Sequence, residues 1–182
     1  AGAGIGGTVA AKFASEGYHS HLCRRSDQEG LEKLVGDIEK SGGSASGELV
    51  NAIEENAIED VITRVEKEIG PIEVVIYNLG AQTGMKLLSQ TSYKEFEWGW
   101  KMASFGLFRV AKILCPLMVD RGKGSILVTS ATAAMRGNAT QHSHAAAMAG
   151  RRMLCQSLNA EFSSKGIPVS YTHLTLPTKL AV

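Results

Sequence analysis

Glycines crowd the first seven residues, where they could hold a phosphate group against the backbone. Residues 1–7 read Ala-Gly-Ala-Gly-Ile-Gly-Gly and run directly into residues 8–16, where apolar side chains recur at helical spacing. Backbone N–H groups and the helix dipole attract phosphate at a helix start, and glycine permits a close approach. A flexible tail is the alternative interpretation. However, Gly17 and a β-like run over residues 19–23 follow, as in a nucleotide-binding βαβ unit.

Two His-Ser-His triplets are the other groups with evident chemistry. His19 and His21 should point to one face of a strand, and His142 and His144 stand at the start of a predicted helix. No cysteine or carboxylate at a recognised ligand spacing accompanies either pair. We therefore expect no metal site.

Strand-like and helical segments alternate along the chain and must position these residues. Helices are expected over residues 8–16, between residues 27 and 41, and over residues 54–69, 93–118 and 144–163. Strands are expected over residues 19–23, 47–50, 72–77 and 124–129, and from residue 166 onward. Parallel strands joined by helices need right-handed crossovers, and helices then cover both faces of the sheet. The pattern predicts an α/β fold with a Rossmann-like, doubly wound parallel sheet.

The composition is that of one globular domain with a real core. The chain has 182 residues, 44% of them hydrophobic and 20% charged, with a net charge of +1. This balance argues against nucleic acid or an anionic membrane surface as the main partner, and no apolar run approaches the roughly 20 residues that span a bilayer. Three widely spaced cysteines within apolar segments indicate reduced, buried thiols. We expect a cytoplasmic protein.

Four segments, in order, resemble the short-chain dehydrogenase/reductase family over residue 1 to about residue 168. The first is Gly4-Ile5-Gly6, which resembles the end of the family's glycine motif, and the second is Asn78-Leu79-Gly80, which resembles its Asn-Ala-Gly motif. Residues 124–137 resemble the fifth strand with its serine loop. Residues 156–158, with Glu161, resemble the end of the helix that carries the catalytic tyrosine and lysine.

The resemblance implies hydride transfer between a nicotinamide and a small carbonyl or alcohol. In the family a tyrosine acts as general acid and base, a lysine lowers its pKa, a serine holds the substrate oxygen and an asparagine completes a proton relay. When the family motif is aligned by counting back from Gln156 and forward from Gly137, the tyrosine, lysine, serine and asparagine positions hold His144, Met148, Ala131 and Ala103. All four members of the tetrad are replaced.

His144 is the candidate substitute acid and base, because the ordinary pKa of histidine is about 6.5. Ser130 or Thr132, which flank Ala131, are the candidate hydroxyls beside it. The alternative is that His144 only fills the pocket. The sequence therefore leaves an oxidoreductase and a non-catalytic dinucleotide-binding relative with a regulatory or structural role both open. A plain α/β interaction domain is the least favoured reading, because it leaves the glycine and Asn-Leu-Gly motifs unexplained.

NADP is the expected cofactor, in preference to NAD. By resemblance, an acidic residue at the end of the second strand would bind the ribose hydroxyls of NAD, but the chain has Arg24 and Arg25 there, which can pair with a 2′-phosphate. A solvated basic turn is the alternative. The resemblance places Asn51 against the adenine edge, and the other expected cofactor-binding residues are Gly2, Gly4, Ile5, Gly6, Asn78 and Gly80.

The resemblance also implies a homo-oligomer, in which the helices over residues 93–118 and 144–163 pack against a second subunit. The aromatic side chains near the first of these helices are expected in the core or at helix interfaces: Phe96, Trp98, Trp100, Phe105 and Phe108.

Both ends of the sequence depart from the family pattern. The family's first strand should precede Ala1, and its substrate loop and last strand should follow residue 168. Residues 169–178 instead resemble the translation of a sequencing-library adapter. We expect residues 1–168 to form a partial dinucleotide-binding domain, and residues 169–182 to be a non-native tail.

Overall fold

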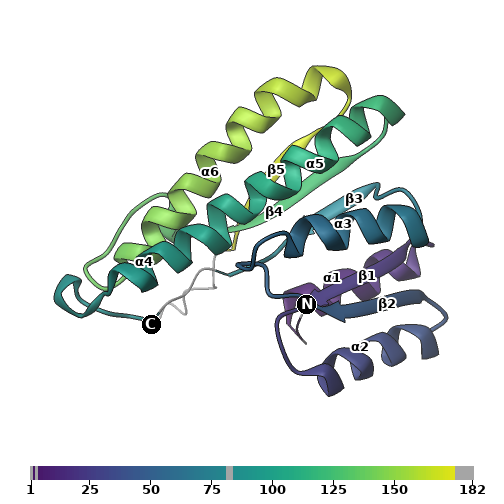
Figure 1. Cartoon of the computed structure of the whole chain (residues 1–182), viewed down its shortest axis with the longest axis horizontal. Helices are drawn as coiled ribbons and strands as arrows, with labels where there is room; N and C mark the ends of the chain where they lie inside the picture. The colour runs from purple at the N-terminus through teal and green to yellow at the C-terminus, as the bar shows by residue number, and fades with distance from the viewer. Residues whose placement is uncertain (1, 3, 81–83, 175–182) are drawn as a thin grey trace, which may run out of the picture. The chain divides into compact units, whose positions relative to one another are not determined.

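Parallel strands alternate with helices throughout the computed structural model, which describes residues 2, 4–80 and 84–174 (Figure 1). Two units, Ala1–Ile69 and Gly70–Val182, each contain a parallel sheet of their own. This confirms the predicted α/β class and parallel strands.

The first unit has two strands and three helices. In chain order these elements are α1 (Ile5–Ser15), β1 (His19–Arg24), α2 (Gln28–Lys40), β2 (Ser44–Leu49) and α3 (Ala57–Glu68). Strands β1 and β2 pair in parallel, with His19 opposite Ser44 and Arg24 opposite Leu49. Leu22 and Ala45 pack with Leu31 and Ile38 of α2 and with Ala14 of α1, and so form the core of this unit.

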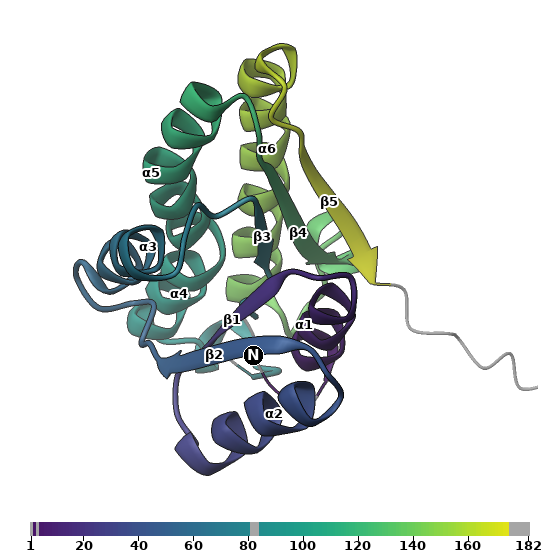
Figure 2. The ribbon, with the colours of Figure 1, turned by 90° about the vertical axis from the view of Figure 1, so that its right-hand side faces the viewer.

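The second unit is built around the sheet β3-β4-β5 (Figure 2). Helices α5 and α6 run side by side along it in Figure 1. Its elements are β3 (Val74–Tyr77), η1 (Leu88–Gln90), α4 (Tyr93–Trp100), η2 (Lys101–Phe105), α5 (Gly106–Arg121), β4 (Ser125–Ala131), η3 (Thr132–Ala134), α6 (His142–Phe162), η4 (Ser163–Lys165) and β5 (Val169–Leu174).

The strand orders are those of a doubly wound sheet. In the order 3-2-1-4-5-6, the pair β2-β1 corresponds to strands 3-2, and β3-β4-β5 corresponds to strands 4-5-6. The tail boundary at residue 168 stays a prediction: residues 169–174 form β5, and residues 175–182 lie outside the described residues.

A π-helical turn, η2, interrupts the predicted helix over residues 93–118. Such turns insert one residue into the helical ladder and often mark functional sites. Close contacts hold this region against α6. The Ser104 hydroxyl donates to the Ala147 carbonyl at 2.8 Å, and a Cβ on Gly150 would lie only 2.7 Å from the same hydroxyl oxygen. Glycine at position 150 is therefore what lets the two helices approach.

Several aromatic residues that the sequence places in the core or at helix interfaces are partly exposed. Trp100 is 46% exposed and stacks on Phe105 at 5.1 Å between ring centroids; Phe105 in turn stacks on Phe108 at 6.4 Å. Phe96 and Trp98 are exposed as well. Their aromatic character predicts burial, but each of these side chains is more than a third exposed. Cys23 is likewise exposed, whereas Cys115 and Cys155 are buried free thiols as predicted.

The helical segment Tyr93–Arg121, which joins α4, η2 and α5, is long and apolar enough to cross a membrane by length and composition alone. About 56% of its most apolar stretch is buried within the protein. A core helix passes the same test, so the segment is weak evidence for a membrane span.

Candidate functional site

The glycine turn opens helix α1. Gly4 is the N-cap residue, and the first turn of the helix carries no acidic side chain. Space is open around Gly2 and Gly4, so a ligand can approach the backbone there. Gly7 has a different role: a Cβ there would lie 2.6 Å from the Gly2 carbonyl oxygen and 3.1 Å from Leu34 of α2. The glycine motif predicts phosphate binding, but it does not reveal this packing role of Gly7.

Arg24 ends strand β1 and is held by an acidic neighbour. Its Nη2 atom lies 2.6 Å from Oδ2 of Asp27, and the side chain of Arg24 is 26% exposed. Oδ1 of Asp27 accepts a hydrogen bond from the Gly30 amide at 2.9 Å and so caps helix α2. Arg25 is exposed. The guanidinium of Arg24 is thus pre-oriented at the end of the strand.

Both asparagines that the sequence assigns to cofactor binding form side-chain hydrogen bonds within the protein. Asn51, which follows β2, donates from Nδ2 to Glu54 Oε1 at 2.7 Å. Asn78, which follows β3, accepts at Oδ1 from the Thr129 hydroxyl at 2.7 Å. Gly80 is exposed two residues further on. The hydrogen bond between Thr129 and Asn78 links the carboxyl ends of the neighbouring strands β3 and β4. Ligands bind at this end of the strands in open α/β sheets.

Three of the four positions that the resemblance assigns to the tetrad lie in one apolar cluster. Ala103 of η2 and Met148 of α6 are buried in one hydrophobic cluster with Ala134 and Ala147, and Ala131 packs against it. The structure therefore brings together three of the four positions that the resemblance assigns to the tetrad. Their side chains carry no group that can transfer a proton.

His144 and Ser130 are both buried, at 7% and 3% exposed. His144 lies in the first turn of α6, and Ser130 is the next-to-last residue of β4. Among the described residues, the Ser130 hydroxyl has no hydrogen-bond partner. A cavity of about 370 Å³ is lined by Thr132 of η3 and by residues of the loop that joins η3 to α6, including Gly137 and Gln141.

Tyr77, the last residue of β3, is a site residue that the sequence does not single out. Its hydroxyl donates to the Met102 carbonyl in η2, and the same hydroxyl oxygen leaves no room for a side chain at position 106, which is glycine. Burial raises the pKa of the phenol to about 12, so it stays protonated. The Arg151 guanidinium lies 5.1 Å from the ring centroid.

His19 and His21 lie on one face of β1, as predicted, and share a hydroxyl. Ser46 Oγ lies 2.7 Å from Nε2 of His19 and 2.8 Å from Nδ1 of His21. His21 Nε2 is 3.1 Å from Glu48, which also pairs with Arg64. No group of three or more metal-ligating side chains occurs in the part of the chain that the structure describes.

Comparison with known proteins identifies the family. A profile described as short chain dehydrogenase matches residues 1–176. The chain belongs to the short-chain dehydrogenase family. It is 28% identical over 164 residues to the 2,3-dihydro-2,3-dihydroxybenzoate dehydrogenase of Bacillus subtilis, covering 90% of this chain and 62% of that protein. It is 26% identical to a 3-oxoacyl-(acyl-carrier-protein) reductase of Thermotoga maritima, covering 93% of this chain and 68% of that enzyme.

Solved structures of the family share the fold. A short-chain dehydrogenase from Rhodopseudomonas palustris is 32% identical with a TM-score of 0.89, over 97% of this chain and 82% of that one. A metagenomic short-chain oxidoreductase, solved in complex with NADP, is 23% identical with a TM-score of 0.88, over 95% of this chain and 78% of that one. The chain thus spans only part of the length of the relatives that it matches.

Proposed function

We propose that the whole protein is an oxidoreductase that transfers hydride between NADP(H) and a small carbonyl or alcohol. The relatives named above are dehydrogenases and reductases, and one structural neighbour binds NADP. The observation that carries the proposal is the buried Ser130 hydroxyl, which has no hydrogen-bond partner in the described part of the chain. A buried hydroxyl without a partner is costly, and a substrate oxygen would supply one.

The described residues fit a phosphorylated dinucleotide. The start of α1 has open space at Gly2 and Gly4 and no acidic side chain in its first turn, so it would hold a diphosphate, with Ile5 and Gly6 donating backbone N–H groups. Arg24 would pair with the 2′-phosphate, with Arg25 adding charge beside it. Asn51 would contact the adenine, and Asn78 and Gly80 would lie along the nicotinamide half.

The bound cofactor supplies the hydride, and the protein must supply the proton. His144 is the group that we assign to this task, because imidazole exchanges protons near neutral pH and no tyrosine or lysine occupies the family positions. Ser130 would donate its hydroxyl hydrogen to the substrate oxygen and fix its position. The catalytic residues in this proposal are therefore His144 and Ser130.

A second function, dinucleotide binding without turnover, is favoured by one observation. Met148, Ala103 and Ala131 pack together with two further alanines where the family places its polar tetrad. An apolar cluster can hold the shape of the pocket but cannot relay protons. Such a protein would act as a regulatory or structural subunit.

We also propose that the whole protein is a homo-oligomer. The exposed stack of Trp100, Phe105 and Phe108 lies on α4, η2 and α5, and contiguous apolar surface of this kind is typical of interfaces. Sedimentation of the whole protein with Phe108→Ser tests this: we expect smaller assemblies than in the wild type, and an unchanged mass would contradict the interface.

Fluorescence titration of the whole protein with NADPH and NADH tests the binding part of the proposal. Tighter binding of NADPH, together with its oxidation in the presence of a panel of small carbonyl compounds, supports the oxidoreductase. Binding without oxidation of NADPH or reduction of NADP in the presence of alcohols supports the second function. Failure to bind either dinucleotide would contradict both.

A further inference from the structure

Arg151 has the largest fully buried side chain among the described residues, with 1% of its surface exposed. It lies in α6, three residues after Met148, and its guanidinium donates to three backbone carbonyls. Nε reaches Ala103 at 3.1 Å, Nη1 reaches Thr129 at 3.0 Å, and Nη2 reaches Leu79 at 2.5 Å.

Carbonyl dipoles and one aromatic ring surround this charge. The Tyr77 ring centroid lies 5.1 Å from the guanidinium carbon, and no carboxylate forms an ion pair with Arg151 in the described part of the chain. Burial lowers the pKa of Arg151, but guanidinium stays protonated in proteins. A buried cation is stable only when it is well hydrogen-bonded, so the three carbonyls that accept from Arg151 must hold their positions.

The three carbonyls belong to three different segments that surround the candidate site, which are called its walls below: η2, the end of β4 and the turn after β3. Ala103 is in the π-helical turn, at the position that holds asparagine in the family. Thr129 immediately precedes Ser130, and its own hydroxyl donates to Asn78. Leu79 stands between Asn78 and Gly80. One side chain thus ties α6 to η2, to the end of β4 and to the turn after β3.

The contact with Leu79 has a consequence for the next amide. A trans peptide is planar, and its C=O and N–H groups point in opposite directions. Because the Leu79 carbonyl points at Arg151, the Gly80 N–H must point away from α6, and Gly80 is exposed. This orientation leaves the Gly80 amide available to a ligand.

We propose that Arg151 is the positioning residue of the dinucleotide site, orienting the turn at residues 78–80 so that Asn78 and the Gly80 amide face the cofactor. This inference rests on the proposed NADP(H) binding. It differs from that proposal because it concerns how the turn is held, which can be observed without any cofactor.

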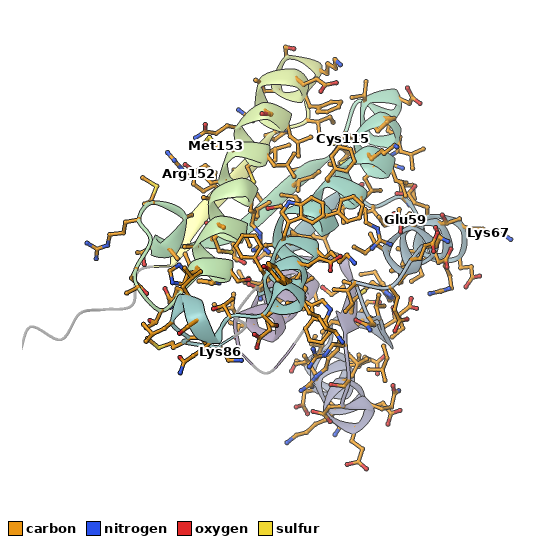
Figure 3. The ribbon with its side chains drawn as sticks, turned by 60° about the vertical axis from the view of Figure 1, so that its left-hand side comes forward. Glu59, Lys67, Lys86, Cys115, Arg152 and Met153 are labelled. Atoms are coloured by element: carbon orange, nitrogen blue, oxygen red, sulfur yellow. The ribbon has the colours of Figure 1, made fainter. Side chains whose placement is uncertain are left out.

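Neighbouring residues offer matched controls. Arg152, on the side of α6 turned away from α5, donates from Nε to the Tyr171 hydroxyl at 3.1 Å and touches none of the three walls (Figure 3). Arg152→Met therefore makes the same change in charge and side chain. Ser104→Ala removes a buried hydrogen bond between η2 and α6 without affecting Leu79. It controls for loss of stability alone.

The experiment compares Arg151→Met, Arg151→Lys and the two controls in the whole protein. We expect Arg151→Met to raise the Kd for NADPH at least tenfold and Arg151→Lys to have a smaller effect, because one ammonium cannot reach three carbonyls. The controls should stay within about twofold of the wild type. Equal losses of affinity in Arg151→Met and Ser104→Ala would overturn the proposal.

Crystal structures of the same variants without dinucleotide give the independent measurement. We expect the Leu79–Gly80 peptide to be rotated in Arg151→Lys, and in Arg151→Met if that variant folds, and unchanged in both controls. An unchanged peptide in Arg151→Lys with wild-type NADPH affinity would overturn the proposal. A wild type that fails to bind NADPH would contradict the proposed function, while the peptide orientation would still decide whether Arg151 holds the turn.

Discussion

Met148 and Ala103 pack in one apolar cluster of the second unit, with 4% and 0% of their surfaces exposed. The family resemblance places a lysine and an asparagine at these two positions, where they serve proton transfer. In this protein the same positions exclude water instead. Any proton exchange must therefore involve other side chains. The sequence offers His144 as the candidate.

Restoring the family's lysine should damage the protein rather than activate it. Met148→Lys would bury an ammonium among alanines, and we expect a loss of about 3 kcal/mol or more in the free energy of unfolding, measured with urea in the whole protein. Met148→Leu keeps the volume and should cost less than about 1.5 kcal/mol. A stable Met148→Lys variant with faster turnover would show that the cluster is not the obstacle.

Arg24 should determine the preference between the two dinucleotides. A charge-assisted hydrogen bond contributes about 1.5–3 kcal/mol, so Arg24→Ala should weaken NADPH binding by roughly 10- to 150-fold while NADH binding changes little. Fluorescence titration with both dinucleotides measures this, and Arg25→Ala, at the exposed neighbour, should cause a smaller loss. Equal weakening of NADPH and NADH would argue against contact with the 2′-phosphate.

Asp27 should weaken the expected contact between Arg24 and the 2′-phosphate of NADPH. Its carboxylate lies 2.6 Å from Arg24, where it competes with a phosphate for the guanidinium. Asp27→Asn keeps a good helix cap and tolerates the left-handed backbone at this position, where φ is 71°. We expect tighter NADPH binding with unchanged NADH binding. Weaker NADPH binding would mean that Asp27 is needed to orient Arg24.

Two glycines at the start of α1, Gly4 and Gly7, should respond differently to substitution by alanine. At Gly7 a methyl group would lie 2.6 Å from the Gly2 carbonyl oxygen, so Gly7→Ala should lower the melting temperature. At Gly4 nothing lies within 4 Å, so Gly4→Ala should melt near the wild-type temperature but bind NADPH more weakly. The reverse pattern would place the phosphate contact elsewhere.

Periodicity and caps predicted the elements well where the chain obeys simple local rules. Helices α2 and α3 begin and end within about three residues of the expected limits, because Asp27 caps the first and Gly70 stops the second. The π-helical turn at residues 101–105 could not be predicted, since one inserted residue does not disturb an apolar pattern enough to be seen. Its cause is tertiary: η2 packs closely on α6.

The sequence names candidate site residues, but it does not show how the residues around them pack. Arg151 escaped notice because arginine is normally exposed. Its spacing from Met148 and Cys155, three and four residues away, places it on the buried face of α6, and that signal could have found it. The exposure of Trp100 could not be read from the sequence, because an aromatic residue at helical spacing serves a core and an interface equally well.

Glu95 should make stability depend on pH at the acid end. Hydrogen bonds from Lys86 and from the amide and hydroxyl of Ser92 lower its pKa to about 2. A lowered pKa means that folding favours the carboxylate, so its contribution is present above pH 4.5 and is lost as the pH falls toward 2. Glu95→Gln should be less stable than the wild type at pH 7.

The gap in melting temperature between Glu95→Gln and the wild type should narrow between pH 4.5 and pH 2. Glu97→Gln is the matched control, since the exposed Glu97 pairs with Lys101 one helical turn away. A gap for Glu95→Gln that stays constant over this range would show that the lost carboxylate is not the cause.

In the proposed reaction His144 supplies the proton for the hydride transfer. The decisive measurement is steady-state oxidation of NADPH by the whole protein with its best carbonyl substrate, for wild type, His144→Ala and His142→Ala. We expect His144→Ala to lower kcat about 100-fold or more, with NADPH affinity kept within about twofold and His142→Ala close to wild type. An unchanged kcat in His144→Ala would contradict the claim, as would a wild type that binds NADPH and never oxidises it.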